Sequence, residues 1–420
     1  MYRLSPLILF LVLYLGTSIL LQDFYSVPIA VAFLISAVYA LLCTKGTYKE
    51  RLAAFTQGVG DPSVGVMLLI FILSGAFAST ARGMGAVDST VNLALSAMPK
   101  EFLLPGIFLA SCFISFSIGT SCGTIAALTP VAAGIADVAG ISLPLMIGLV
   151  VGGTYFGDNL SFISDTTIIA TQTQGCRMRD KFLTNIRLVL PCAVILLIVY
   201  YLIGRNLTDS AAAGDYQFIR ILPYLCVIVA ALCGIDVIIV LVIGILSTAV
   251  IGISQGTFTP LTWLQEINSG IMGMAELILC TLLASGMLSI IRSQGGIQYI
   301  IAKISRHIGS RRGAECSIAM LVVLVNICTA NNTVAIITVG GIAHEIAERF
   351  RISPRRSASI LDTMSCFTQG LLPYGAQILI AAGLASVNPV SIVPYLYYPF
   401  LIGITVMLSI AFSPQHLQKR

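Results

Sequence analysis

Long runs of apolar residues dominate the pattern along this chain. Leu7–Leu21, Val27–Cys43 and Val64–Ala78 are apolar at most consecutive positions, without the alternation of apolar and polar residues that marks a membrane β-strand. Inside a bilayer a segment must satisfy its own backbone hydrogen bonds, as a helix does. A helix needs about 20 apolar residues to cross a hydrocarbon core roughly 30 Å thick. The pattern therefore predicts an all-α integral membrane protein with about ten crossings.

Two stretches of the first half, 1–208, are apolar but interrupted. The stretch 102–140 has a polar turn at Gly119–Gly123, which predicts a hairpin of two helices. The stretch 142–175 contains glycine and several polar residues at its middle, which predicts a broken helix.

The second half, 209–420, repeats this order. A polar turn divides 314–350, which predicts a second hairpin, and a polar segment divides 356–386, which predicts a second broken helix. The uninterrupted runs expected to span lie near 4–22, 24–43, 64–80, 186–204, 218–233, 235–253, 274–291 and 392–412.

Local similarity and loop charge indicate that the halves are inverted repeats. Phe71–Arg82 resembles Thr281–Arg292, and Gly119–Thr124 resembles Cys328–Thr333. The loop after the first hairpin has no basic residue, whereas its counterpart, Arg349–Arg356, has four. Each half is predicted to cross the membrane an odd number of times, five spans besides the re-entrant hairpin. Inverted repeats with broken helices are a recurring design of secondary transporters.

The basic residues predict the orientation. Cytoplasmic loops of membrane proteins are enriched in Lys and Arg. If the main basic clusters face the cytoplasm, only Arg82, Lys100, Arg205 and Arg220 lie on the outer side. We therefore expect a protein of the cell inner membrane with both termini in the cytoplasm. The inside clusters are Arg3, Lys45–Arg51, Arg177–Arg187, Arg292–Arg312, Arg349–Arg356 and Lys419–Arg420.

Composition narrows the class of protein. Of 420 residues, 57% are hydrophobic and 10% are charged, against about 25% charged in soluble domains. The net charge of +5 does not indicate a nucleic-acid partner, because the basic residues sit in short loops. The eleven cysteines form no C-x-x-C pair, and no phosphate-binding loop, metal cluster or nucleophile constellation occurs. We therefore expect no enzyme activity and no resident cofactor, and a lipid bilayer as the main partner.

The first break carries the residues best suited to ion chemistry. Asp158 and Asp165 lie in a segment otherwise apolar enough to span, and a carboxylate at the bilayer centre costs about 2.5–3.5 kcal/mol. Carboxylates, hydroxyls and freed carbonyls are ligands for a hard cation such as Na⁺. Burial disfavours a charged carboxylate, so such a group can exchange a proton for a cation. A structural alternative, compatible with ion binding, is that both Asp residues cap half-helices.

The segment Gly157–Thr167 also carries a family resemblance. Its sequence, GDNLSFISDTT, resembles the G-D-x-x-S-P-x-S-D-T-T signature of NhaC-type sodium/proton antiporters, within the ion transporter superfamily. Phe162 stands where the family commonly has Pro, and Asn159 where Lys is frequent. The resemblance extends over most of the chain, from Ser74-Gly75 to about Ala382. It implies Na⁺/H⁺ exchange and an inverted-repeat fold with two hairpins, although some members exchange organic anions or amino acids. The residues that match the signature are Asp158, Ser161, Ser164, Asp165, Thr166 and Thr167.

The second break and the hairpin turns supply further candidates. Pro373 and Gly375 should open the helix that contains Asp362, Ser365 and Gln369, although Asp362 could instead be a solvated residue near a loop. The two hairpin turns are expected to meet near the midplane. Their free N–H groups suit an anion and their oxygens suit a cation, and the sequence leaves both open. The turn residues are Thr120, Ser121, Asn331, Asn332 and Thr333.

We expect a Na⁺/H⁺ antiporter that works by alternating access, with Asp158 and Asp165 binding Na⁺ transiently in competition with protons. One alternative is a Na⁺- or H⁺-coupled carrier of an amino acid or small carboxylate, which the donors of Asn331 and Asn332 favour slightly. A passive channel or a non-transporting scaffold is a second alternative, against which the paired broken helices argue. A homodimer and a small organic solute are the other candidate partners.

Overall fold

The structure is a computed structural model that describes residues 4–16, 28–97, 99–162, 164–205, 215–233, 235–299 and 308–412. All regular structure in these ranges is helical, with no strand among them. The prediction of an all-α membrane protein is confirmed. The predicted boundary between the halves at 208, and parts of the runs 4–22 and 24–43, lie outside the described residues.

The first half begins with α1 (Ser5–Leu11), a π-helical turn η2 (Val12–Gly16), α3 (Ile29–Cys43), α4 (Tyr48–Val59), α5 (Pro62–Gly83) and α6 (Ala86–Ala97). It continues with α7 (Lys100–Ile118), α8 (Ser121–Val138), α9 (Leu143–Leu160), α10 (Asp165–Gln174) and α11 (Met178–Arg205).

The second half begins with α12 (Phe218–Leu232), α13 (Val237–Ser254), α14 (Pro260–Gly273) and α15 (Ala275–Ser293). It continues with α17 (Arg311–Thr329), α18 (Asn332–Arg349), α19 (Pro354–Leu371), α20 (Ala376–Ala385), α21 (Pro389–Ile392), the 3₁₀ turn η3 (Val393–Tyr395) and α22 (Tyr397–Ala411).

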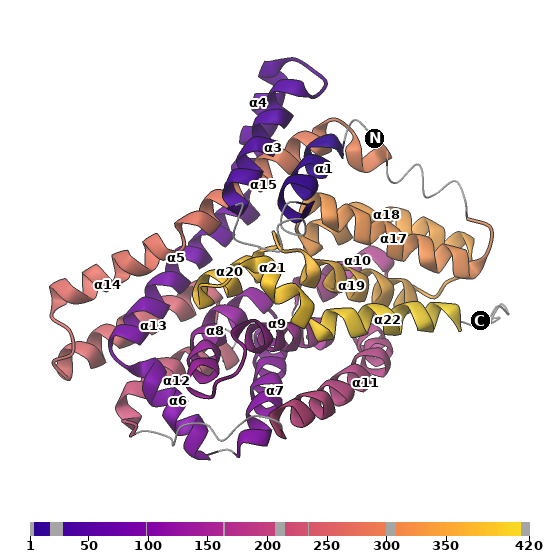
Figure 1. Cartoon of the computed structure of the whole chain (residues 1–420). Helices are drawn as coiled ribbons and strands as arrows, with labels where there is room; N and C mark the ends of the chain where they lie inside the picture. Colours follow the sequence, from indigo (N-terminus) through magenta and orange to yellow (C-terminus); the bar gives the residue numbers. More distant parts are fainter. Residues whose placement is uncertain are drawn as a thin grey trace.

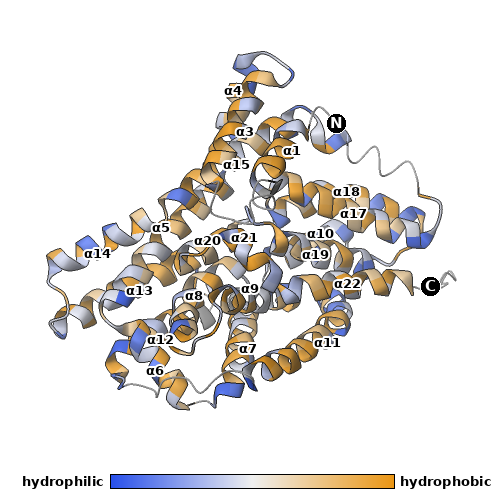
Figure 2. Ribbon diagram, viewed as in Figure 1, coloured by the Kyte–Doolittle hydropathy of each residue, from blue (hydrophilic) through white to orange (hydrophobic). Residues whose placement is uncertain are grey.

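The helices are those of a multi-pass membrane protein. In the described part of the chain, seven helical segments are long and apolar enough to cross a membrane, or eight if the bent segment that begins with α19 counts as one span. Four shorter apolar helices, α1, α3, α12 and α22, accompany them. Hydrophobic residues cover most helices, and hydrophilic ones gather mainly at helix ends and on α4 and α14 (Figure 2). The number of ten crossings stays a prediction.

Both predicted hairpins are pairs of helices joined by tight turns. α7 and α8 reverse at Gly119, whose φ is 74°, and α17 and α18 reverse at Ala330, whose φ is 49°. α8 packs on α7, and α18 packs on α17. The predicted bounds 102–140 and 314–350 thus agree with the helices to within three residues.

Both predicted broken helices are also present. In the first, α9 ends at Leu160 and α10 begins at Asp165, and the flanking residues Ser161 and Ser164 have extended backbone. In the second, α19 ends at Leu371 and α20 begins at Ala376. Pro373 lies in this second gap, where it lacks the N–H that a continuing helix would use.

The turns support the predicted internal repeat. The described residues with left-handed φ fall into five pairs, each about 210 residues apart, so nearly every reversal of the first half recurs in the second. Three second-half members, Ala330, Arg351 and Ser386, are not glycine although their first-half partners are. The inverted orientation stays a prediction. The pairs are Gly46 with Gly256, Gly85 with Gly295, Gly119 with Ala330, Gly140 with Arg351, and Gly175 with Ser386.

The two halves cross each other in matching ways. α4 packs on α15 and α14 packs on α5, while α8 packs on α20 and α10 packs on α18. A Cβ atom on either Gly75 or Gly270 would overlap the backbone of the other, so only glycine permits this approach of α5 and α14. Figure 1 shows α5, α13 and α14 on one side of the central α8, α9 and α20, with α11, α17, α18 and α22 on the other. α4, α6 and α14 were not expected from the apolar runs.

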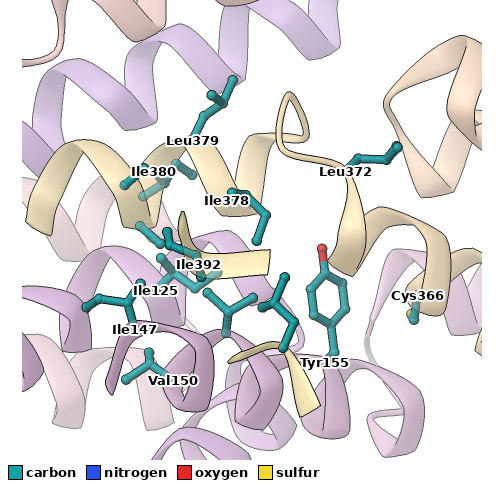
Figure 3. Packing of buried hydrophobic residues seen from close by; sticks show 14 of the residues in the cluster. Ile125, Ile147, Val150, Tyr155, Cys366, Leu372, Ile378, Leu379, Ile380 and Ile392 are labelled. Atoms are coloured by element: carbon teal, nitrogen blue, oxygen red, sulfur yellow. The ribbon is translucent and has the colours of Figure 1, made fainter. Parts of the chain in front are cut away.

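An apolar core joins the broken helices. Ile125 of α8, Ile147 and Val150 of α9, and Ile378 and Ile380 of α20 are all fully buried in one cluster (Figure 3). Because these side chains come from both halves, their packing fixes the two breaks relative to each other.

Candidate functional site

The two hairpin turns and the two breaks line one cavity of about 330 Å³. Apolar side chains of α5, Val66, Met67 and Ile70, complete its wall. The cavity therefore brings together residues far apart in the sequence. The predicted site residues on its wall are Thr120, Ser121, Asp158, Ser164, Asp165, Thr166, Asn331, Asn332, Thr333 and Gln369.

The lining of the cavity is acidic. Its side chains include the carboxylates of Asp158 and Asp165, and no Lys, Arg or His occurs among the described lining residues. A cleft lined by one sign of charge concentrates ions of the opposite sign. The cavity is therefore better suited to a cation than to an anion.

Asp158 is the buried carboxylate of this cavity. It lies in the last turn of α9, is 3% exposed, and interacts with the nearby Ser121 hydroxyl. Its Oδ1 atom has no hydrogen-bond partner within the described protein. The alternative that Asp158 caps a half-helix is wrong, because helix caps of this type occur at the start of a helix. A buried carboxylate oxygen in this situation needs a cation or a proton.

Amide side chains connect Asp158 with the second break. The Gln369 amide donates to Oε1 of Gln377 at 3.0 Å and to the carbonyl of Ala330 at 3.0 Å. Gln377 donates to the Ser121 hydroxyl at 3.1 Å, and this hydroxyl lies near Asp158. Gln377 was not predicted. These contacts link a side chain at each break to both hairpin turns.

Asp165 occupies a different position at the break. It is the first residue of α10, after the N-cap residue Ser164, and it is exposed toward the cavity. An acidic residue in the first turn interacts favourably with the helix dipole. The Ser164 and Thr166 hydroxyls lie 3.1 Å apart beside it. Asp165 therefore adds negative charge at the wall without being buried.

A buried ion pair lies behind the cavity wall. Lys181 of α11 is 1% exposed, and its Nζ atom lies 2.7 Å from Oδ2 of Asp362 of α19, which is fully buried. The expectation that Asp362 could be a solvated loop residue is wrong. Lys181 is not a loop residue either, because α11 begins at Met178 and the Lys181 side chain is buried; the cytoplasmic position of its cluster stays a prediction.

The remaining predicted residues hold the backbone of the breaks. The Asn159 amide donates to the Tyr398 hydroxyl at 2.9 Å, and the Thr167 hydroxyl lies 3.4 Å from the carbonyl of Asp158. Ser365 donates to the carbonyl of Asp362, and its own carbonyl accepts from Asn326 at 2.9 Å. Ser161 is buried at the end of α9. None of these side chains, nor Asp362, is on the wall of the cavity.

Four residues near the cavity were not predicted from the sequence: Lys181, Asn185, Gln377 and Tyr398. Lys181 and Asn185 are four residues apart and share one face of α11, and this spacing of two polar residues at the start of a span was an available signal. Gln377 lies one turn from the second break. No pattern in the sequence indicates Tyr398, because its neighbours in α22 are apolar.

Comparisons with known proteins identify the family of this chain. The model of the Na⁺/H⁺ antiporter family matches residues 1–205 and 216–413. The malate-2H⁺/Na⁺-lactate antiporter of Bacillus subtilis is 24% identical over 96% of this chain and 94% of its own. The Na⁺/H⁺ antiporter NhaC of Alkalihalophilus pseudofirmus is 23% identical over 92% and 89%. The YdaH transporter of Alcanivorax borkumensis aligns with 92% of this chain and 99% of its own at 13% identity and a TM-score of 0.46. The chain belongs to the Na⁺/H⁺ antiporter family.

Proposed function

We propose that this protein exchanges Na⁺ for H⁺ across a membrane and that Asp158 binds either ion in the cavity between the two breaks. The observation that carries the proposal is the unbonded Oδ1 atom of this buried carboxylate in an acidic cavity. Na⁺ prefers oxygen ligands. Asp158, Asp165, the Ser121 hydroxyl and Oε1 of Gln369, which also has no partner among described residues, can supply them.

Competition at one carboxylate accounts for exchange. With Na⁺ bound, the negative charge of Asp158 is balanced by the metal. With a proton bound, the carboxyl group is neutral and its attraction for Na⁺ is lost. A buried charge without a partner is costly, so the site changes sides readily only when one of the two ions occupies it.

The two halves of the chain can expose the cavity alternately to the two sides of the membrane. Each contributes a hairpin turn and a break to the cavity, so a motion of these elements against α5 and α14 would expose the cavity to one side and then the other. The positive charge of the loops supports an inner-membrane protein with both termini in the cytoplasm.

A coupled carrier of a small organic solute is the second candidate. The cavity volume of about 330 Å³ exceeds the need of one ion, and the amides of Asn331, Asn332 and Gln377 could bind a polar solute. The name of the Bacillus subtilis relative includes two carboxylates, malate and lactate. The lack of basic side chains on the described wall argues against a carboxylate, so we rank this function second.

Transport in inverted vesicles separates the two functions. An imposed pH gradient, acidic inside, is followed with a lumenal pH dye while Na⁺, Li⁺ or K⁺ is added. Antiport predicts dissipation of the gradient by Na⁺, with vesicles that lack the protein as the control. If no cation dissipates the gradient, and labelled malate, lactate or an amino acid accumulates, the organic-solute function is correct instead.

A further inference from the structure

The ammonium group of Lys181 is fully coordinated by oxygen atoms. Its Nζ atom lies 2.7 Å from Oδ2 of Asp362, and it donates to the carbonyl of Asn159 at 2.9 Å and to the hydroxyl of Thr167 at 2.6 Å. An ammonium has three protons to donate, so each has an acceptor. Such complete satisfaction is what permits a charge to remain buried.

Asn185, one turn later on α11, binds the same two groups. Its amide donates to the carbonyl of Asn159 at 2.8 Å and to Oδ2 of Asp362 at 2.9 Å. The Asn159 carbonyl belongs to the last turn of α9, where helix carbonyls lack intrahelical donors and carry partial negative charge. Lys181 and Asn185 therefore cap the helix that ends beside Asp158.

These contacts connect three parts of the protein. The Asn159 carbonyl is on one arm of the first break, Thr167 is on the other arm, and Asp362 is on α19 of the second half. The Thr167 hydroxyl also lies near the carbonyl of Asp158. A single side chain from α11 thus holds both arms of the break against the second half, one residue from the carboxylate that is proposed to bind Na⁺.

The charges of Lys181 and Asp362 compensate each other. Removal of either charge would leave the other buried without a partner, which is costly. The charged groups close to Asp158 are Asp165 on α10, Lys181 on α11 and Asp362 on α19. With the last two paired, Asp158 and Asp165 are left to respond to Na⁺ and H⁺.

We propose that Lys181 and Asp362 are positioning residues: as a fixed ion pair they hold the arms of the first break so that Asp158 binds Na⁺, and neither exchanges a proton during transport. The proposal rests on the proposed function for the role of Asp158. The structural role of the pair, by contrast, can be measured without transport.

The test compares two single variants with the neutral pair. Lys181→Met leaves Asp362 without its cation and Asp362→Asn leaves Lys181 without its anion, so each should lower the thermal unfolding midpoint of the purified protein by about 5 °C and the Na⁺-driven rate at least about tenfold. The double variant Lys181→Met/Asp362→Asn removes both charges. Its unfolding midpoint should return most of the way to that of wild type, and its rate at saturating Na⁺ should be within about threefold of wild type.

The Na⁺ requirement and the pH profile decide whether the ion pair positions Asp158 or itself carries a proton. Because the break is no longer held, the double variant should need about tenfold more Na⁺ for half-maximal rate, while the midpoint of its pH profile stays that of wild type. Arg187→Met is the matched control, since it removes a basic side chain from an exposed position of α11. It should leave rate, Na⁺ requirement and unfolding midpoint unchanged.

Two results would overturn the proposal. A double variant that unfolds like wild type but loses exchange, or shifts the midpoint of the pH profile, would make the pair a proton carrier. Single variants that unfold like wild type would show that the pair holds nothing in place. If wild type itself fails to exchange Na⁺ for H⁺, the proposed function fails, and the unfolding midpoints still decide whether Lys181 and Asp362 act as a structural pair.

Discussion

The two breaks have nearly the same backbone and different chemistry. In each, a helix of 18 residues is followed by a four-residue gap and a helix of 10 residues. The interval that separates Gly119 from Ala330 also separates Asp158 from Gln369, and Asp165 from Ala376. The first break therefore carries two carboxylates where the second carries an amide and a methyl group.

Hydrogen bonds behind the breaks repeat as well. Ser115 of α7 donates to the carbonyl of Thr154, and at the same interval Asn326 of α17 donates to the carbonyl of Ser365. The framework that holds a break open is thus present in both halves, while the ion-binding groups are concentrated in one. The backbone geometry of a break and its charge can therefore be altered separately.

Asp158→Asn should have the largest effect, because it replaces the buried carboxylate of the first break by an amide, the kind of group that Gln369 carries at the equivalent position of the second break. We expect the Na⁺-driven rate in inverted vesicles to fall at least about 100-fold, since the amide cannot exchange Na⁺ for a proton. The amount of protein in the membrane should not change. Retention of more than a tenth of the wild-type rate would mean that another group carries the proton.

Gly75→Ala tests the crossing of the halves instead of the breaks. The added methyl group would overlap the backbone of Gly270, so we expect a loss of about 2 kcal/mol of stability, seen as a lower unfolding midpoint and less protein in the membrane. Gly65→Ala in the same helix is the control, because no atom lies near its new methyl group. Equal behaviour of the two variants would contradict the close approach of α5 and α14.

Asp165→Asn should act on affinity more than on rate. Its carboxylate is exposed at the cavity wall, where it attracts cations through a weakly screened charge. We expect the Na⁺ concentration for half-maximal rate to rise about tenfold, with the maximal rate within about threefold of wild type. Asp88→Asn, which removes the acid from the first turn of α6, is the control. Complete loss of exchange would instead place Asp165 beside Asp158 as an essential group.

The smallest effects are expected at the hairpin turns, and they should have opposite signs. Gly119→Ala puts a side chain into a left-handed conformation at a cost of about 1 kcal/mol. Ala330→Gly removes the same strain at the equivalent turn. Part of this gain in stability is offset because glycine increases the conformational entropy of the unfolded chain. The unfolding midpoint should fall in the first variant and hold or rise slightly in the second. A fall of equal size in both would show that the turns are not equivalent.

The sequence predicted the hairpins and breaks well because each has a local cause. Pro373 and Gly119 interrupt apolar stretches, and buried polar residues such as Asp158 stand out against their neighbours. The helices α4 and α14 were missed because they are amphipathic and end in loops, so neither has the long apolar run that identifies a span.

Lys181 was missed for a different reason. It belongs to a group of basic residues that all favour the cytoplasmic side, and apart from its four-residue spacing from Asn185 nothing local distinguishes it from Arg179 or Arg187. Its burial depends on Asp362, which lies far away in the sequence on another helix. Pairing of this kind is a property of the tertiary structure, so hydropathy and charge counts could not reveal it.

The matching crossings have a consequence for biogenesis. As the first half leaves the ribosome, the faces of α5, α8 and α10 that will contact α14, α20 and α18 have no partner. Lys181 is also synthesised well before Asp362. Until α19 is inserted, we expect its ammonium group to be hydrated or bound to the end of α9 instead of paired with Asp362. We therefore expect the first half, before the second is inserted, to expose polar groups such as Lys181 that have partners only in the complete protein.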